Sequence, residues 1–296
     1  MISKAHLLES IQTGLKESLG TVIDLRWSRD LAGGDINQAA LIQSKDNKWF
    51  LKYRNNAPPG MFEAEALALA EISKTGCIRV PEAIACGSQN GTSWLVLECL
   101  DLISNGPASL LGEQLAALHS ISDDGFGWSG DNFIGTTPQL NRRAENWTEF
   151  WRDCRLKPQL LMARDAGFGS RLLDRGERLL ASMEQLMQDH QPAASLLHGD
   201  LWSGNKAYTN AGQPVIFDPA SYYGDRETDI AMTELFGGFE PAFYSAYRSI
   251  TPLADGYPLR RELYNLYHVL NHLNLFGQAY LGRCENIIAS LLAQID

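Results

Sequence analysis

The hydrophobic positions of the chain follow two different periods, and the period changes near residue 100. Before that point, short apolar runs alternate with turns rich in Gly, Asn, Asp and Pro, which is typical of β-strands. After it, apolar residues recur every three or four positions over longer stretches, which is typical of helices. We therefore predict an α+β fold with a small β-rich part at residues 1–100 and a larger, mainly helical part at residues 101–296.

In the first part the pattern predicts a helix at 5–19, strands at 22–28, 38–43 and 49–53, a helix at 61–73, an edge strand or loop at 79–88, and a buried strand at 92–97. The helix at 61–73 carries one apolar stripe. Glu65 falls on that stripe, whereas Glu63 falls well off it. An acid on a buried stripe requires a cation, so Glu65 is the candidate for an ion pair; the alternative is that it sits at the solvated margin of the stripe.

In the second part the pattern predicts helices at 110–119, 147–162 (interrupted by Pro158) and 169–189, and from residue 230 to the end. A loop rich in glycine and aromatic residues occupies 125–137. Ordered loops of this length tend to be functional. Residues 207–209 and 215–217 look like two short strands of a hairpin, joined by a turn with Asn210 and Gly212.

Composition narrows the classes of protein. The net charge of −10 argues against nucleic acid or an anionic membrane as the main partner. No apolar run approaches the roughly 20 residues of a membrane helix, and the N-terminal stretch lacks the apolar core of a signal peptide. The five cysteines are scattered, odd in number and without a CxxC pair, which favours reduced thiols and a cytoplasmic location over a disulfide frame.

The stretch from Leu196 to Ala220 carries the strongest chemical signal. His198-Gly199-Asp200 follows two apolar residues, Asn205 comes five positions after Asp200, and Asp218 follows the hairpin. Because a hairpin brings its two ends together, we expect Asn205 beside Asp218, with Asp200 one loop away. One acid that receives or orients a proton, with an amide and a second acid that hold Mg²⁺, is the set that phosphoryl transfer needs. The alternative is a polar loop with a structural role and no metal.

A candidate for phosphate binding lies in the first part. The turn Gly33-Gly34-Asp35-Ile36 can bring backbone N–H groups close to phosphates, although a plain hairpin turn is an equal alternative. Lys52 favours the functional interpretation, since between Leu51 and Tyr53 in a strand it points away from both neighbours. In kinases such a lysine grips the phosphates of the nucleotide, and Glu65 is its expected partner.

The buried strand at 92–97 ends in Glu98-Cys99-Leu100, before a polar segment with Gly and Pro. Such a segment is a good candidate for a hinge between two lobes. Its backbone groups are candidates for binding the edge of an adenine.

The spacing from Asp200 to Asn205 and the later Asp218 resembles the protein-kinase signature. His-Gly-Asp stands here in place of His-Arg-Asp, and Asp-Pro-Ala in place of Asp-Phe-Gly, which points to the small-molecule relatives, the aminoglycoside and choline kinase-like enzymes. Within that group the chain resembles the fructosamine kinase (ketosamine 3-kinase) family. The motifs that carry the resemblance span nearly the whole chain in order: AGGDINQA, LKY, MFEAE, LVLECLDL, LGEQLAALH, DNFIGTTPQLN, FWRDCRLKPQL, LLHGDLWSGN, FDPASYYGDRETDIAM and YHVLNHLNLFG.

The resemblance implies a bilobal protein-kinase-like fold, with residues 1–100 as the nucleotide-binding lobe and residues 101–296 as the catalytic and substrate-binding lobe. It implies ATP and Mg²⁺ as cofactors and a glycated amine, small or protein-bound, as the acceptor. Phosphorylation on the 3-hydroxyl of such a ketosamine (a fructosamine or ribulosamine) gives a labile product, hence a deglycating role.

Carried over by position, the catalytic base is Asp200 and the Mg²⁺ ligands are Asn205 and Asp218. The phosphates are anchored by Lys52 and Glu65 beneath the turn at 33–36, and adenine is bound at 98–100. Asp229 and His198 brace the catalytic loop; for His198 the alternative is proton transfer. One departure is Asp35, since some members carry a redox-active cysteine there; we expect no redox switch at this position.

Two residues are candidates for the sugar site. Trp202 follows the proposed base by two positions, and His272 shares a helix face with His268 and Phe276. An indole offers a face for sugar C–H groups and an N–H donor. From the residues alone, packing roles are the simpler interpretation; the family resemblance favours the sugar site for both. The alternatives are a kinase for an aminoglycoside, choline or a sugar, and a catalytically dead nucleotide-binding module.

Overall fold

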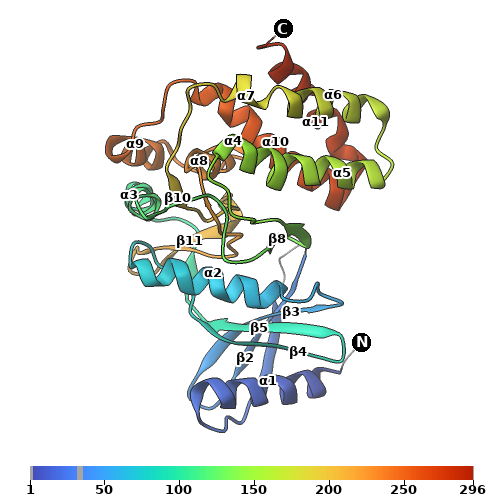
Figure 1. Cartoon of the computed structure of the whole chain (residues 1–296). Helices are drawn as coiled ribbons and strands as arrows, with labels where there is room; N and C mark the ends of the chain where they lie inside the picture. The colour runs from blue at the N-terminus through green and yellow to red at the C-terminus, as the bar shows by residue number, and fades with distance from the viewer. Residues whose placement is uncertain (1–2, 32–35, 296) are drawn as a thin grey trace. The chain divides into compact units, whose positions relative to one another are not determined.

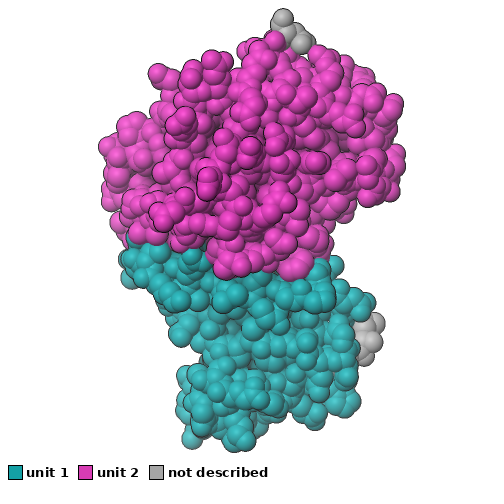
Figure 2. Space-filling model, in the orientation of Figure 1, with its two compact units in different colours: residues 1–107, 206–219 teal, residues 108–205, 220–296 magenta. Residues whose placement is uncertain are grey.

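The computed structural model describes residues 3–31 and 36–295. The chain forms two compact units, which Figure 2 distinguishes by colour. Unit 1 comprises Met1–Pro107 and Lys206–Pro219, and unit 2 comprises Ala108–Asn205 and Ala220–Asp296. The division differs from the expected boundary at residue 100, because unit 1 also takes the segment 206–219 from the second part of the chain.

Unit 1 is built on an antiparallel sheet of five strands in the order β1-β2-β3-β5-β4. The strands are β1 (Arg26–Leu31), β2 (Gln38–Gln43), β3 (Lys48–Asn55), β4 (Ala83–Gln89) and β5 (Thr92–Glu98). Helices α1 (Lys4–Leu19) and α2 (Met61–Thr75) cover opposite faces of this sheet (Figure 1). Both faces of the sheet are therefore covered. The face under α1 is apolar, and the face under α2 contains the charged side chain of Lys52.

The face under α1 is an apolar core. Leu7, Ile11 and Leu15 of α1 are buried against the sheet together with Leu51 and Trp94. Each such side chain stabilises the fold by about 1.5–3 kcal/mol relative to an exposed one. Because side chains alternate along a strand, the neighbour of Leu51, which is Lys52, is presented to the face that α2 covers.

Two predicted strands have different bounds in the structure. The first strand begins at Arg26 rather than Val22, because its partner β2 ends at Gln43, which pairs with Arg26. The segment at 79–88, expected as an edge strand or loop, contains β4, which pairs along β5 at the edge of the sheet.

A second, small sheet explains why 206–219 belongs to unit 1. It has the order β12-β11-β6, with β6 (Leu102–Ile103), β11 (Lys206–Thr209) and β12 (Pro214–Ile216). Tyr208 pairs with Ile103, and the amide of Ile216 donates to the carbonyl of Arg79 at 3.0 Å. The predicted hairpin is therefore present, and its hydrogen bonds join it to the first part of the chain.

Unit 2 is mainly helical. Its α-helices and its π-helical turn are α3 (Ala108–His119), α4 (Trp147–Trp151), η1 (Arg152–Leu156), α5 (Lys157–Asp165), α6 (Ser170–Ala181), α7 (Met183–Leu186), α8 (Glu227–Leu235), α9 (Pro241–Ile250), α10 (Tyr257–Phe276) and α11 (Leu281–Leu292). Two 3₁₀ turns are η2 (Ser203–Asn205) and η3 (Gln278–Tyr280). Helix α10 is the centre of the unit and packs against α5, α8 and α11 (Figure 1).

Short strands complete unit 2. One sheet has the order β13-β10-β7, with β7 (Ser122–Asp123), β10 (Ala194–Leu196) and β13 (Tyr223–Gly224). The loop expected at 125–137 contains β8 (Asn132–Ile134), which pairs with β9 (Thr137–Gln139). Strand β10 leads directly into the His198-Gly199-Asp200 segment.

Pro158 does not interrupt its helix as expected. Helices α4 and α5 continue through the π-helical turn η1, where the amide of Lys157 donates to the carbonyl of Arg152. Pro158 directly follows this wider turn, at the start of α5, and the turn accommodates its ring. The predicted helix at 169–189 is divided into α6 and α7.

Among the helices of the described residues, none is both long enough and apolar enough to cross a bilayer.

Candidate active site

Unit 1 contains a buried lysine held by two carboxylates. The ammonium of Lys52 lies 2.7 and 2.8 Å from the two carboxylate oxygens of Glu65. It also lies 2.8 Å from Oδ1 of Asp218, at the end of the hairpin. The predicted ion pair between Lys52 and Glu65 is therefore present, and Glu63 is exposed on the outer side of α2.

The electrostatics of this triad keep the lysine charged. Burial lowers the pKa of Lys52, but the charges of Asp218 and Glu65 outweigh burial, so its pKa is raised. Burial raises the pKa of Glu65, and Lys52 offsets part of that rise. The Asp218 side chain is 46% exposed and is the member of the triad able to reach a further cation.

The backbone of Asp218 is also unusual. Its φ angle is 58°, in the left-handed region that disfavours side chains by roughly 1–2 kcal/mol. Strain of this kind persists where the surrounding structure imposes it and gathers at functional sites. Here the strain and the bond to Lys52 fix the direction of the carboxylate.

Unit 2 contains the His198-Gly199-Asp200 loop, held by a buried acid of α8. The carboxylate of Asp229 accepts hydrogen bonds from the amides of His198 at 2.7 Å and Gly199 at 2.9 Å. Burial raises the pKa of Asp229, but hydrogen bonds from His119 and the loop outweigh burial and lower it. Asp229 therefore stays ionised at neutral pH, and its expected bracing of the loop is confirmed.

Glycine is required at position 199. Its φ angle is 84°, and an added Cβ would come within 2.1 Å of the carbonyl oxygen of Ala220. The two backbone segments are also hydrogen-bonded, because the amide of Ala220 donates to the carbonyl of His198 at 2.9 Å. The loop and the chain after Pro219 are thus packed backbone to backbone, so the loop has one defined conformation.

Within that loop, Asp200 and Asn205 face each other. The Asn205 amide donates to the backbone carbonyl of Asp200 at 2.9 Å and lies 3.5 Å from its Oδ2. The Asp200 amide donates to Nδ1 of His198 at 3.3 Å, so His198 acts as a lock on the loop. The other carboxylate oxygen of Asp200, Oδ1, lies 4.0 Å from Nδ1 of His268 on α10. Asp200 is partly exposed, as an acid that meets a substrate must be.

Trp202 stands out from the surface of unit 2, with 40% of it exposed. Its indole lies over Gly204, where an added Cβ would come within 2.2 Å of the ring. The loop after α8 packs on the same turn, because a Cβ at Gly238 would meet Ser203 at 2.5 Å. One part of the indole therefore packs on Gly204 and another part is exposed to solvent. A tryptophan with a pure packing role in the core would be fully buried.

His272 is half-buried in an aromatic group. Its ring lies 5.1 Å from Phe236, 5.4 Å from Phe276 and 5.1 Å from Tyr280. Its Nδ1 donates to the carbonyl of His268 at 2.8 Å. Burial lowers the pKa of His272, so the ring is neutral and its Nε2 is a hydrogen-bond acceptor.

The remaining predicted nucleotide residues lie in unit 1. Gly33, Gly34 and Asp35 fall outside the described residues. The carbonyl of Ile36 accepts a hydrogen bond from the Arg54 guanidinium.

The expected hinge follows β5. The amide of Glu98 donates to the carbonyl of Glu82 at 2.8 Å, and the Glu98 carboxylate pairs with Arg79. The backbone amide and the side-chain carboxylate of Glu98 therefore both have partners within unit 1. Cys99 and Leu100 are partly buried.

Sequence reasoning did not find the amide network behind the DNFIGTTPQLN motif. Gln139 donates to the carbonyl of Ala220 and to Asn132, and Asn132 donates to the carbonyl of Ser221, at 2.8–3.0 Å. Tyr267 of α10 donates to Gln139 at 2.7 Å. The motif therefore fixes the chain just after the Asp218 segment. Only the long-range partners reveal this role, and no local pattern encodes them.

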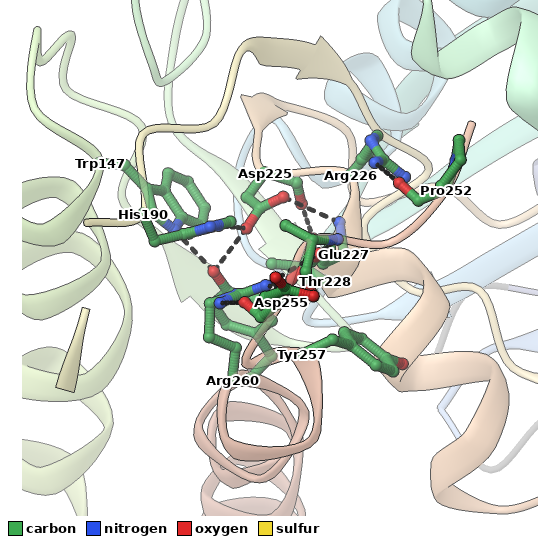
Figure 3. A network of polar contacts seen from close by, with 12 residues as sticks. Trp147, His190, Asp225, Arg226, Glu227, Thr228, Pro252, Asp255, Tyr257 and Arg260 are labelled. Atoms are coloured by element: carbon green, nitrogen blue, oxygen red, sulfur yellow. Dashed lines mark hydrogen bonds and ion pairs between the residues drawn. The ribbon is translucent and has the colours of Figure 1, made fainter. Parts of the chain in front are cut away.

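A separate cluster of one histidine and two acids lies elsewhere in unit 2 (Figure 3). Ligand atoms of His190, Asp225 and Glu227 lie within 4.8 Å of one another, the spacing of a metal site. Each is already paired: His190 with Asp225 at 2.6 Å, and Glu227 with Arg260 at 2.7 Å. We interpret this group as a buried ion-pair network that joins α8 to α10.

Comparison with known proteins first defines the fold. A crystal structure of an aminoglycoside phosphotransferase matches with a TM-score of 0.64 at 18% identity, over 97% of this chain and 99% of that chain. This chain therefore shares the fold of that aminoglycoside phosphotransferase, in agreement with the kinase-like α+β fold predicted from the sequence.

Closer relatives then define the family. A family model described as fructosamine kinase matches residues 7–294. A Synechocystis protein assigned as a ketoamine kinase is 42% identical over 289 residues, which is 96% of each chain. A crystal structure from Haemophilus somnus, assigned as a fructosamine-3-kinase, has a TM-score of 0.88 at 32% identity, over 96% of this chain and 97% of that chain. The chain belongs to the fructosamine kinase family, so the predicted family and kinase class are confirmed.

Proposed function

We propose that this protein transfers the γ-phosphate of ATP to the 3-hydroxyl of a ketosamine, a sugar linked through nitrogen to an amine. The observation that carries the proposal is the geometry of the loop that contains Asp200. Asp229 holds the backbone just before Asp200, and the side-chain amide of Asn205 donates to the backbone carbonyl of Asp200. Family membership names the reaction, and this loop supplies the group that performs it. Phosphorylation makes the adduct labile, so the role is deglycation in the cytoplasm.

Unit 1 is the proposed nucleotide-binding part. Lys52 is buried, charged and aimed by Glu65, so it is suited to grip the phosphates. The turn at 33–36 would cover them, and Cys99 and Leu100 would take the adenine edge. Glu98, whose side chain pairs with Arg79, would complete this adenine-binding segment.

Mg²⁺ is the second proposed cofactor, with Asp218 and Asn205 as its protein ligands. Carboxylate and amide oxygens are the donors that Mg²⁺ prefers. Asp218 fits the role, because its side chain is 46% exposed and is directed by a strained backbone. The ion would neutralise charge on the phosphates during transfer.

Unit 2 is the proposed acceptor part. Asp200 is the base that receives the proton of the sugar hydroxyl as the oxygen attacks phosphorus. Positioned acids of this kind contribute typically about 10²–10⁴-fold in rate. Trp202 would stack on the sugar through its open face, and Nε2 of His272 would accept a hydrogen bond from a hydroxyl.

The proposal is tested by incubating the protein with ATP and Mg²⁺ and a panel of acceptors, with phosphate transfer followed by mass spectrometry. The panel contains fructosyl- and ribulosyl-lysine, free and in a peptide, and unmodified lysine. Kanamycin, choline and fructose represent the alternative kinases. We expect transfer to the glycated lysines alone. Preferred transfer to another acceptor, or ATP binding with no transfer to any of them, would overturn the proposal.

A further inference from the structure

Helix α10 presents a histidine to the catalytic loop that the proposed mechanism does not yet use. His268 is 4% exposed, and its Nδ1 lies 4.0 Å from Oδ1 of Asp200. Among the described residues, no hydrogen-bond partner lies within reach of this nitrogen. A buried polar atom without a partner is costly, so its presence beside a functional carboxylate calls for an explanation.

The contact is not an ion pair at neutral pH. Burial, with smaller contributions from His272 and Arg155, lowers the pKa of His268 to about 3, and Asp229 opposes them only in part. A neutral imidazole carries one N–H, and a carboxylate only accepts hydrogen bonds. The tautomer that suits Asp200 is therefore the one with its hydrogen on Nδ1.

We propose that His268 is a positioning residue, whose Nδ1–H donates to Oδ1 of Asp200 in the working enzyme. The two atoms lie 4.0 Å apart, so a shift of about 1 Å would bring them within hydrogen-bond distance. Hydrogen bonds in catalytic sites are often long without substrate and tighten in its complex. With Oδ1 held by His268, the orientation of the carboxylate is fixed, and Oδ2 is the oxygen that receives the proton of the acceptor. This inference rests on the proposed role of Asp200 as base.

The experiment compares variants that keep or remove a donor at the Nδ1 position. An Asn side chain places its amide near the Nδ1 of histidine, a Gln side chain places it near Nε2, and Leu has no donor. For the acceptor that the wild type phosphorylates, we expect His268→Leu to lower kcat about 10- to 100-fold, as mispositioning by about 1 Å does. The KM for ATP should change less than twofold. His268→Asn should recover most of kcat, and His268→Gln should not.

Asn265 provides a matched control. It lies on the same helix, is 5% exposed and has an unpartnered side-chain oxygen, Oδ1. Asn265→Leu should leave kcat within twofold of the wild type. The reaction is first established with the wild-type protein. A failure of the proposed function would appear there, before any variant of His268 is compared.

Two results would overturn the inference. One is a wild-type kcat for His268→Leu. The other is equal loss in the Asn and Gln variants, which would indicate packing without a directed hydrogen bond. The comparison of Asn with Gln decides the matter even if His268→Leu does not fold.

Discussion

The ammonium of Lys52 is bonded at 2.8 Å to the carboxylate of Asp218, a residue that follows it by 166 positions in the sequence. The first residue is the proposed phosphate anchor, and the second is a proposed metal ligand. Their contact connects the sheet of unit 1 to the hairpin that completes the same unit. Changes to either residue are therefore expected to affect the nucleotide and its metal together.

Lys52→Ala should weaken productive ATP binding strongly, by a factor of about 10² or more in kcat/KM, because a charged contact to the phosphates is lost. Glu65→Ala should have a smaller effect, since Glu65 acts by aiming Lys52. Steady-state kinetics at varied ATP concentration measure both. Glu63→Ala is the matched control, as Glu63 lies on the exposed side of the same helix. A damaging Glu63→Ala with a harmless Glu65→Ala would contradict the triad.

Asp218→Asn should keep the fold, because asparagine tolerates the left-handed backbone at φ 58°. It should raise the Mg²⁺ concentration required for half-maximal activity by about tenfold or more, since a neutral amide replaces a charged ligand. Titration of activity with Mg²⁺ at saturating ATP, alongside a melting curve, provides the measurement. An unchanged Mg²⁺ requirement would remove Asp218 from the metal site.

Asp200→Asn should lower kcat about 10²–10⁴-fold, the usual contribution of a positioned base. The affinity for ATP should be nearly unchanged, because the residue meets the acceptor. Single-turnover assays and direct nucleotide titration separate the two quantities. Full activity of the variant would exclude Asp200 as the base.

Gly204→Ala tests the position of Trp202. The added Cβ would lie 2.2 Å from the indole, so the ring must move. We expect a higher KM for the ketosamine, comparable to that of Trp202→Ala, with little change in the KM for ATP. Gly130→Ala is the control, since a Cβ at Gly130 meets no atom within 4 Å. If the two alanine variants at 202 and 204 lowered the melting temperature sharply and both KM values equally, Trp202 would have a packing role.

His268 should make the protein less stable in mild acid. Its pKa is about 3 in the folded state, below the unfolded value of 6.5, so the unfolded chain takes up the proton first. Stability from this group is therefore lost as the pH falls from about 6.5, at about 1.4 kcal/mol per pH unit. The groups near the ring that oppose or assist its protonation are Asp200, Asp229, His272 and Arg155.

Urea unfolding at pH 7 and pH 5 measures this contribution. From pH 7 to pH 5 the wild type should lose about 2 kcal/mol that His268→Leu keeps. The lowered pKa values of Asp225 and Asp229 act below about pH 4, whereas His272 and Glu65 titrate within this window in both proteins, so the difference between the two proteins is the quantity that reports on His268. Equal losses in the two proteins would show that His268 is not held neutral by burial.

The parts of the site that local patterns encode were predictable. The strand alternation at Lys52 and the helical stripe at Glu65 gave an ion pair that the structure contains. The bracing by Asp229 followed from the family motif. The amide network of Gln139 was not predictable, because its partners are backbone carbonyls some 80 positions away in the sequence. The same is true of His268, whose significance depends on one distance between α10 and a loop.

The fold was predictable in class but not in its grouping of segments. The sequence pattern identified the hairpin with strands at 207–209 and 215–217, yet it contains no information on which sheet the hairpin joins. The pairing of Tyr208 with Ile103 decides that question. Pro158 likewise was expected to break a helix, and the π-helical turn before it accommodates the ring instead.

The assignment of 206–219 to unit 1 has a consequence for biosynthesis. A ribosome releases the chain from its N-terminus, and the first 107 residues emerge long before the hairpin that completes their unit. Until Asp218 emerges, the ammonium of Lys52 can pair with Glu65 but not with Asp218. Half of unit 2 must therefore be translated before unit 1 can finish folding, and a nascent or truncated chain ending near residue 200 would contain neither unit whole.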